Sequence, residues 1–280
     1  MTGYLIKRLV ELMVALLIMS LLVFSLARLT GDPVALLLSD YATEEERTTL
    51  TQQLGLDKPL TEQYVIFITA ALQGDFGNSI SGNQQPAMEL VLERLPASLM
   101  LASAAMIISL LAGVPMGVIA AARRGSKTDI LIRVFTLLGQ SIPVFWLGMV
   151  FIYFFSVQLG WLPTSGYGSL VHLILPATSM ALFTIAAITR LTRVSMIDAL
   201  SSEYIKLARI KGLPERVIIW KHALRNSLIP LVTYMGTFFA MMITGAVVVE
   251  TVFSWPGIGR LAYQSILDRD FPVMQAVVLT

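Results

Sequence analysis

The 280-residue sequence contains no cysteine and few charged residues. Without cysteine, the loops of the protein cannot rely on disulfide bonds, although this absence does not identify a compartment. Asp, Glu, Lys and Arg make up 14% of the residues, against about 25% in an ordinary soluble domain, whereas apolar residues reach 56%. A soluble core does not need that much apolar surface, so the composition indicates an integral membrane protein.

Four long stretches of the chain contain no charged side chain. A bilayer span needs about 20 mostly apolar residues, so their lengths predict one, one, two and one spans in chain order. The third stretch is divided at 160–168, where glycine and proline mark a turn. The four stretches lie between Glu11 and Arg28, Arg94 and Arg123, Arg133 and Arg190, and Arg225 and Glu250.

The pattern predicts an all-α polytopic membrane protein of about five spans and the start of a sixth. The last apolar segment begins at Phe271 and is only begun at Thr280, so we expect a sixth span that is either truncated or not represented. The first apolar segment follows Lys7-Arg8 as a signal peptide would, but its length favours a retained span. The predicted spans cover residues 8–29, 97–122, 132–157, 172–192 and 228–250. The predicted regions are a first transmembrane helix at 1–30, an extracytoplasmic helical region at 31–95 and a core transmembrane domain at 96–280.

Lysine and arginine are distributed unevenly over the predicted loops. With five spans, 14 of the 20 basic residues share a side with the N-terminus and five lie on the other, while Arg28 is at a boundary. The positive-inside rule therefore predicts a cytoplasmic N-terminus and a cytoplasmic loop at 193–226, although the long outer loop counts for less.

The predicted outer region contains signals for two short helices. Thr43 is expected to cap the first, because three glutamates follow it and Gly55 marks a stop. The second is expected from about Leu60 to Leu72, with apolar residues on one face before Gly74. We expect both helices to pack on the outer side of the spans.

The predicted inner loop contains an amphipathic segment. Leu200, Tyr204, Leu207 and Ala208 recur at helical spacing, and Gly212 is expected to end that helix just before a proline. A short helix with an apolar stripe, held outside the membrane, needs a partner to cover the stripe.

Catalytic motifs are missing from the sequence. His172 and His222 do not form a metalloprotease pair, and no G-x-S-x-G elbow is present. The string at 125–128, GSKT, lacks the glycine spacing of a phosphate loop. We therefore expect a non-enzymatic chain that binds no cofactor or metal itself.

An ion-coupled secondary transporter is the alternative class. Such carriers place ionisable groups within the membrane, where they are costly and therefore mark function. Here Glu11 and Glu250 lie near span ends, and the predicted span centres carry only neutral polar groups. The pattern therefore favours an energy source outside this chain.

The inner loop also resembles a family pattern. Its sequence EYIKLARIKGL at 203–213, followed by HALRN at 222–226 and by Pro230, resembles the docking loop of binding-protein-dependent ABC importers. It is most similar to the peptide/nickel permease branch, whose loop lays a short helix into a groove on the ATPase. The resemblance implies ATPase docking by Glu203, Tyr204, Leu207, Ala208, Gly212 and Leu213, with loop support from His222, Arg225 and Asn226.

The loop departs from the general importer pattern, which has Glu-Ala-Ala, a later glycine and then Ile-x-Leu-Pro. Ala208, Gly212 and Leu224 fit that pattern, whereas Arg225 stands in place of the proline. This departure is similar to what the peptide branch shows and so narrows the subfamily. Further matches to that branch, in its order and spacing, are Gly31-Asp32-Pro33, the segment 54–60, Gln63-Tyr64, Gly74-Asp75-Phe76-Gly77 and the segment 255–260.

The resemblance implies a permease with the helical bundle of a type I ABC importer in a bacterial inner membrane. It further implies a second homologous permease, two ATPase subunits that bind ATP and Mg²⁺, and an extracytoplasmic solute-binding protein. Relatives of this type handle dipeptides, longer peptides, glutathione and chelated nickel, and the sequence does not choose among them.

Polar and aromatic residues near the spans have two interpretations each. Gln140 and Ser141, close to the helix-breaking Pro143, and Thr237 and Thr244 in the fifth span are candidates for a translocation path. Helix packing explains the same residues and is favoured over the path. Trp161 and Trp255 stand at predicted span ends, so we expect interfacial anchors there.

Overall fold

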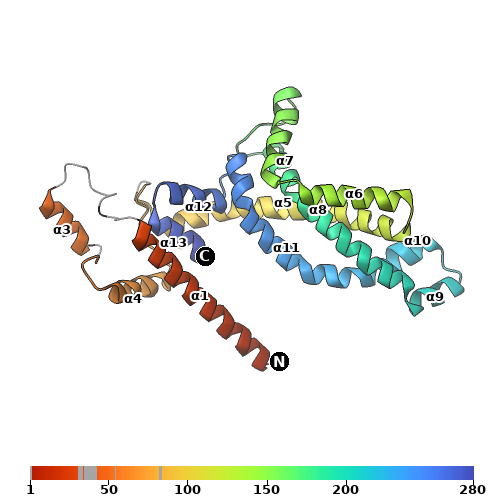
Figure 1. Ribbon diagram of the computed structural model, residues 1–280, viewed down its shortest axis with the longest axis horizontal. Coiled ribbons are helices and arrows are strands. Elements are labelled where there is room, and N and C mark those ends of the chain that lie inside the picture. The colour runs from red at the N-terminus through yellow and green to blue at the C-terminus, as the bar shows by residue number, and fades with distance from the viewer. Residues whose placement is uncertain (1, 31–33, 35–42, 54, 82–83) are drawn as a thin grey trace. The chain divides into compact units, whose positions relative to one another are not determined.

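The computed structural model describes residues 2–30, 34, 43–53, 55–81 and 84–280 (Figure 1). Its regular elements are helices, together with one isolated β-bridge between Asn78 and Pro86 in the described part of the chain. The family match at Gly31-Asp32-Pro33 lies outside the described residues. The chain divides into two compact units, one formed by Met1–Leu95 with Leu261–Thr280 and the other by Pro96–Arg260.

The first unit contains the two short helices that the sequence predicts. Helix α3 (Glu44–Gln53) begins with a capping box, in which the Thr43 hydroxyl accepts from the Glu46 N–H at 3.3 Å and the Glu46 carboxylate accepts from the Thr43 N–H at 2.8 Å. Gly55 follows its end with φ +63°. Helix α4 (Leu60–Ala71) ends before Gly74, which also has positive φ. Both predicted helices are therefore confirmed.

Helix α1 (Thr2–Thr30) organises the first unit. Its Phe24 ring lies 5.5 Å from Tyr64 and 5.7 Å from Phe67 of α4, and the Ser20 and Tyr64 hydroxyls are 2.8 Å apart. Helix α13 (Phe271–Leu279) also packs on α1 and begins where the last apolar segment was predicted. Apolar packing and one buried hydroxyl pair therefore hold α1 in this unit.

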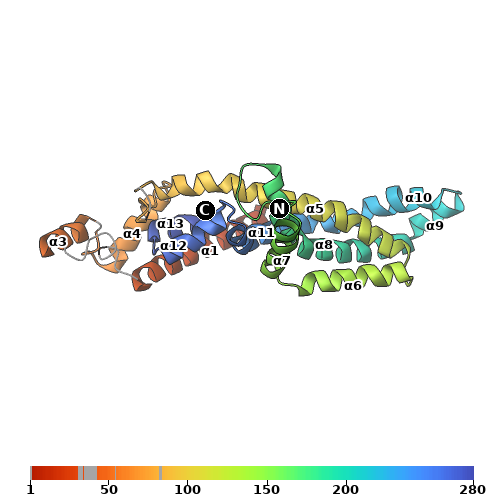
Figure 2. The ribbon, with the colours of Figure 1, turned by 90° about the horizontal axis from the view of Figure 1, so that it is seen from above.

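The second unit is a bundle around α8 (Leu170–Ser201), which packs against α6, α7 and α11 (Figure 2). Small residues make α8 narrow on its buried sides, among them Ala177, Ala181 and Ala186. The other elements of this unit are α5 (Ala87–Ala122, from Pro96 onward), α6 (Lys127–Ser141), α7 (Val144–Phe151), η1 (Ile152–Gln158), α9 (Glu203–Ile210), α10 (Glu215–Val217), η2 (Ile218–Ala223), α11 (Leu224–Val252) and the first turn of α12 (Ile258–Leu267).

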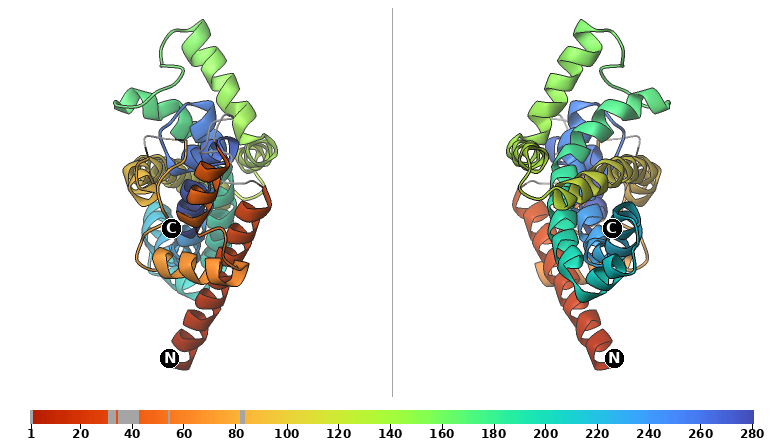
Figure 3. Two further views of the ribbon diagram at one scale, coloured as in Figure 1. Left: turned by 90° about the vertical axis from the view of Figure 1, so that its left-hand side faces the viewer. Right: turned by 90° about the vertical axis from the view of Figure 1, so that its right-hand side faces the viewer.

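Four helices in the described residues are long and apolar enough to span a membrane, or up to five if one bent pair counts as a span. The span predicted at 132–157 is divided into two helices, α6 and α7, which meet at an angle of 99° and form either a broken span or a re-entrant loop (Figures 1 and 3). The physical reason is Pro143, which lacks an N–H and holds the preceding Ile142 extended at φ −85°, ψ 125°. The other long helices contain the predicted spans and extend beyond them, as α5 does by starting at Ala87.

Helices α5 and α8 approach closely at two glycines. A Cβ atom at Gly117 would lie 2.6 Å from the Thr192 Cβ and 2.8 Å from the Thr189 carbonyl oxygen, and one at Gly113 would lie 2.9 Å from Ile188. Because one of these neighbours is backbone, α8 could only accept a side chain there by shifting as a whole. The two glycines therefore fix the spacing of the α5–α8 pair.

We expect Gly117→Ala to destabilise the helical bundle by about 1–3 kcal/mol, the usual cost of overpacking. The matched control is Gly236→Ala on α11, where the added Cβ would meet nothing within 4 Å and should raise helix propensity. Both variants are heated stepwise in detergent, and the fraction of protein that remains in the monodisperse size-exclusion peak measures their stability. Equal heat resistance of Gly117→Ala and the wild type would contradict the close approach.

The corner between α11 and α12 is built on a buried carboxylate. Glu250 is fully buried, accepts from the Ser98 hydroxyl at 2.5 Å and from the Arg260 N–H at 2.9 Å, and so caps the start of α12. The Ser98 hydroxyl in turn accepts from the Ile258 N–H at 2.8 Å. A Cβ at Gly257 would overlap the Glu250 carboxylate, so only glycine fits beside it. Glu250 therefore has a structural role here.

The expected interfacial position of Trp255 is wrong. Its side chain is fully buried beside this corner, where the indole N–H donates to the Ala97 carbonyl at 2.9 Å and the ring meets Tyr167 edge-on at 4.9 Å. Pairing of the indole N–H is what allows tryptophan to enter a core. Trp161, in contrast, is exposed at the end of η1, as an anchor would be.

Candidate docking site

The predicted docking loop begins with a sharp change of direction. Helix α8 ends at Ser201, Ser202 is extended at φ −72°, ψ 156°, and α9 starts at Glu203. The predicted stripe that joined Leu200 to Tyr204 in one helix is therefore wrong, since Leu200 belongs to α8. The break arises at two consecutive serines, which compete for backbone hydrogen bonds: the Ser202 hydroxyl donates to the Ala199 carbonyl at 2.5 Å.

One face of α9 packs on its own unit. Ile205 is fully buried in an apolar cluster with Met196 of α8 and Ile218 of η2, and the partly buried Ala208 packs against the same cluster. Cores of this kind leave little room for a change in volume. The inner face of α9 thus fixes the helix to α8 and η2.

The other face of α9 presents large apolar side chains to the surroundings. Leu207 is 58% exposed and Ile210 is 81% exposed, with Tyr204 and Leu213 exposed beside them. Leu207 and Ala208 therefore do not form one stripe, as was predicted, because a step of one residue turns the side chain by about 100°. Ile210 was missed, although an apolar residue two positions before a helix-stopping glycine was the available signal.

The turn after α9 contains a glycine with positive φ and is bridged by an ion pair. Gly212 has φ +76°, which confirms it as the glycine stop of the helix. Across the turn, the Arg209 guanidinium lies 2.7 Å from the Glu215 carboxylate, and this hydrogen bond raises the pKa of Arg209. On α9 itself, Lys206 pairs with Glu203 at 2.7 Å. The exposed apolar face is thus bordered by ion pairs.

His222, Arg225 and Asn226 lie inside continuous helix. Residues Glu215–Val252 run without a break through α10, η2 and α11, so no helix begins at these residues and they do not cap the fifth span. His222 is half-buried, while Arg225 and Asn226 are exposed.

The four path candidates are in different surroundings. Gln140 lines a cavity between α6 and α8 and accepts from Arg190 at 3.3 Å, whereas the Ser141 hydroxyl donates to the Leu137 carbonyl in its own helix. Thr237 and Thr244 are exposed on α11. No hydrogen bond in the described part of the chain joins either threonine to the residues of α6.

Two known protein families match this chain, one over its N-terminal part and the other over the rest. Residues 113–280 match the binding-protein-dependent transport system inner membrane component, and residues 1–102 match the N-terminal part of such membrane components. The chain belongs to this family. The assignment made from the docking-loop sequence, to the permeases of ABC importers in the peptide/nickel branch, is confirmed.

Named permeases are similar to this permease over its whole length. The glutathione transport system permease proteins GsiC of Escherichia coli strain K12 and of Salmonella typhimurium strain LT2 are each 42% identical over 280 residues, which is 100% of this chain and 91% of theirs. Such proteins are transport subunits rather than enzymes. This permease is accordingly a non-catalytic subunit.

Solved structures share the fold at lower identity. An inward-facing MetNI methionine ABC transporter aligns with a TM-score of 0.56 at 19% identity, over 69% of this permease and 90% of that chain. A second crystal form of MetNI gives a TM-score of 0.55. The all-α fold of an ABC importer permease is therefore established.

Proposed function

We propose that this permease, with a second homologous permease, forms the path for a peptide-like solute that carries carboxylates, such as glutathione or a short peptide. The observation that carries this proposal is the 42% identity to glutathione permeases over every residue of the chain. Oligopeptides and nickel chelates, which the related systems also handle, are the other solutes to test.

The proposed complex contains two ATPase subunits, which bind ATP and Mg²⁺, and an external solute-binding protein. The ATPases would contact the loop at Glu203, Tyr204, Leu207, Ala208, Gly212 and Leu213. The exposed Leu207 and Ile210 support this proposal, because two large apolar side chains in a water-facing loop are stabilised by a covering partner. In the proposed role Ala208 acts indirectly, by seating α9 on its own unit.

Coupling in this proposal is a difference in stability between two states. ATP-driven closure of the ATPases would shift the α9 helices of the two permeases, and the permeases would change from outward-facing to inward-facing. Binding energy at α9 can bias that equilibrium only by as much as it differs between the two states.

We expect uptake by the reconstituted complex to require ATP. Proteoliposomes that hold both permeases and the ATPases are supplied with the binding protein. They should accumulate labelled glutathione or dipeptide only when ATP and Mg²⁺ are present on the side of the membrane where the ATPases lie. A proton or sodium gradient without ATP should give no uptake. The buried Glu250 of the second unit would be a candidate ion carrier, but both of its carboxylate oxygens accept hydrogen bonds that cap α12. Gradient-driven uptake by this chain alone, abolished by an ionophore, would replace the proposal with a secondary carrier.

We expect labelling to place α3 outside and the α9 turn inside the cell. The sequence has no cysteine, so single cysteines at Thr49 and Lys211, both exposed, give no background. An impermeant thiol reagent should label Thr49→Cys in intact cells and Lys211→Cys only after the cells are opened. The reverse pattern would remove both the cytoplasmic N-terminus and the docking role of α9.

A further inference from the structure

A cavity of about 300 Å³ between α6 and α8 is lined by an unusual set of side chains. Three arginines border it, Arg133 from α6 and Arg190 and Arg193 from α8, and the described residues that line it include no acidic residue. Thr136, Gln140 and Thr189 add polar groups between apolar ones. Cations concentrated at one cavity between membrane helices call for an anion.

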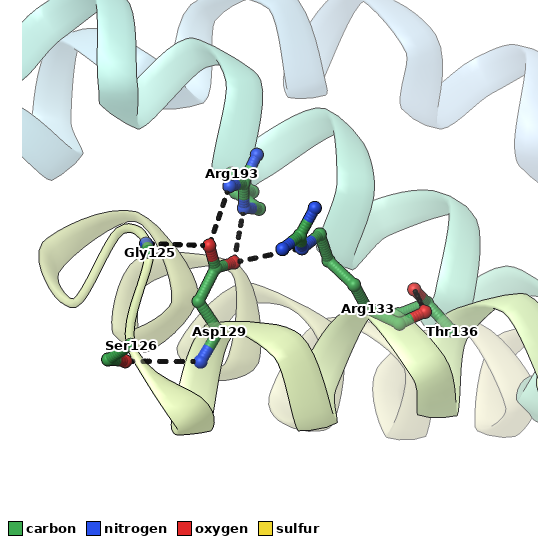
Figure 4. Close-up of polar contacts among 6 residues, drawn as sticks. All are labelled: Gly125, Ser126, Asp129, Arg133, Thr136 and Arg193. Carbon is green, nitrogen blue, oxygen red and sulfur yellow. Dashed lines mark hydrogen bonds and ion pairs between the residues drawn. The ribbon is translucent and has the colours of Figure 1, made fainter.

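One carboxylate beside the cavity does not balance the three arginines. Asp129, which is buried, accepts from Arg193 at 2.7 and 2.9 Å and from the Gly125 N–H at 3.0 Å, while Arg133 lies 3.6 Å away (Figure 4). The charges of Asp129 and Arg193 therefore neutralise each other. Subtracting one acid from three bases leaves the cavity with a formal charge of +2, carried by Arg133 and Arg190.

The remaining donors have weak partners within the protein. Arg190 donates to the neutral amide oxygen of Gln140 at 3.3 Å, a long hydrogen bond for a guanidinium. Thr189 is 1% exposed and its hydroxyl has no hydrogen-bond partner among the described residues. A buried hydroxyl without a partner is uncommon, and Thr189 is one of the residues that line the cavity.

The surroundings of the cavity select the kind of anion. Ile132, Leu137 and Ala186 form the apolar part of the cavity wall, and the Leu137 side chain is 67% exposed. A ligand that fits both features has an anionic head and long apolar tails. The proposed topology, on which this inference rests, places the cavity toward the cytoplasmic leaflet, where basic pockets between helices bind anionic lipid head groups.

We infer that the cavity binds one anionic phospholipid of the cytoplasmic leaflet. Arg190 and Arg133 hold its phosphate, the Thr189 hydroxyl donates to it, and the acyl chains lie against Ile132 and Leu137 of α6. The bound lipid would then cover the seam between α6 and α8, at the end of α8 that leads into α9.

Native mass spectrometry of the purified complex tests the inference without ATP or solute, so the result does not depend on what the complex transports. Complexes are equilibrated with equal amounts of phosphatidylglycerol and phosphatidylcholine. We expect selective retention of phosphatidylglycerol, with affinity falling about fivefold in Arg190→Gln and again in the double variant with Arg133→Gln. Thr189→Val, which keeps every charge, should lower retention by a smaller factor.

The matched control is Arg124→Gln, which removes the same charge from an exposed residue in the turn before α6, outside the cavity lining. An equal loss in this control would show diffuse surface attraction and overturn the site. Displacement of the lipid by millimolar glutathione or phosphate in the wild type, but not in Arg190→Gln, would assign the cavity to a soluble anion instead. Arg190→Lys keeps the charge. If this variant retains the lipid normally, the loss in Arg190→Gln comes from the missing anion contact and not from a misfolded complex.

Discussion

Leu207→Glu should lower ATP-driven uptake at least about tenfold while the permease inserts and folds normally. The side chain is exposed and turned away from the apolar cluster under α9, so a carboxylate there disturbs nothing within this chain. In the assembled complex, the carboxylate would be enclosed in an apolar groove at a cost of several kcal/mol, more than the 1–3 kcal/mol typical of coupling between sites. Co-purification of the ATPase and uptake in proteoliposomes measure the two losses.

Other substitutions in the loop separate docking from folding. Ala208→Glu should also lose uptake, but with lower heat resistance, because Ala208 packs against the unit's own cluster. Gly212→Val should cost about 1–2 kcal/mol through its left-handed backbone. The neutral control is Arg216→Gln. A change at the neighbouring Glu215 would not be neutral, because the Glu215 carboxylate pairs with Arg209. Full ATPase attachment and uptake by Leu207→Glu would exclude α9 as the docking element.

Glu250→Ala should lower the free energy of unfolding by about 3 kcal/mol or more. The substitution removes two hydrogen bonds and leaves the Ser98 hydroxyl and the Arg260 N–H without their acceptor in a buried corner. Glu250→Gln keeps the size and one acceptor oxygen, so it should lose less than half as much. Thermal unfolding in detergent compares the two variants with the wild type.

Uptake distinguishes this structural role from a proton-carrying one. If Glu250 only caps α12, Glu250→Gln should transport in proportion to the amount of folded complex. A variant that is as stable as the wild type but inactive would show that the carboxylate takes part in transport. Gly257→Ala offers an independent check, because its Cβ would displace the carboxylate and should destabilise the same corner.

Local signals in the sequence predicted most of the helices correctly. Thr43 with its glutamates, Gly55 and Gly212 each act through the neighbouring backbone, so the residue type alone determines the outcome. The family assignment also followed from contiguous residues of the loop at 203–213. Pro143 was identified as a helix breaker, but the size of the bend depends on how α7 packs against α8 and α11, which no local pattern contains.

The features that were predicted wrongly depend on contacts between distant segments. Trp255 is of a residue type that often anchors a span at the membrane surface, but it is buried here by packing and by its hydrogen bond to Ala97, 158 residues away. The cavity that Arg133 and Arg190 share was missed, because it arises only when α6 packs on α8. Leu207 and Ala208 were separated by the cluster around Ile205, whose members come from α5, α8 and η2.

The unbroken helix of Glu215–Val252 has a mechanical consequence. Its 38 residues follow about 57 Å of helix axis from the turn after α9 to the buried corner at Glu250. The path is curved (Figure 1), and it contains the π-helical turns of η2 and Pro230, which both interrupt the regular α-helical hydrogen-bond pattern. Because no residue of the segment leaves the helix, a displacement of the loop at α9 would be transmitted through the backbone of α11 to the corner at Glu250. The bend would determine the direction in which that displacement arrives.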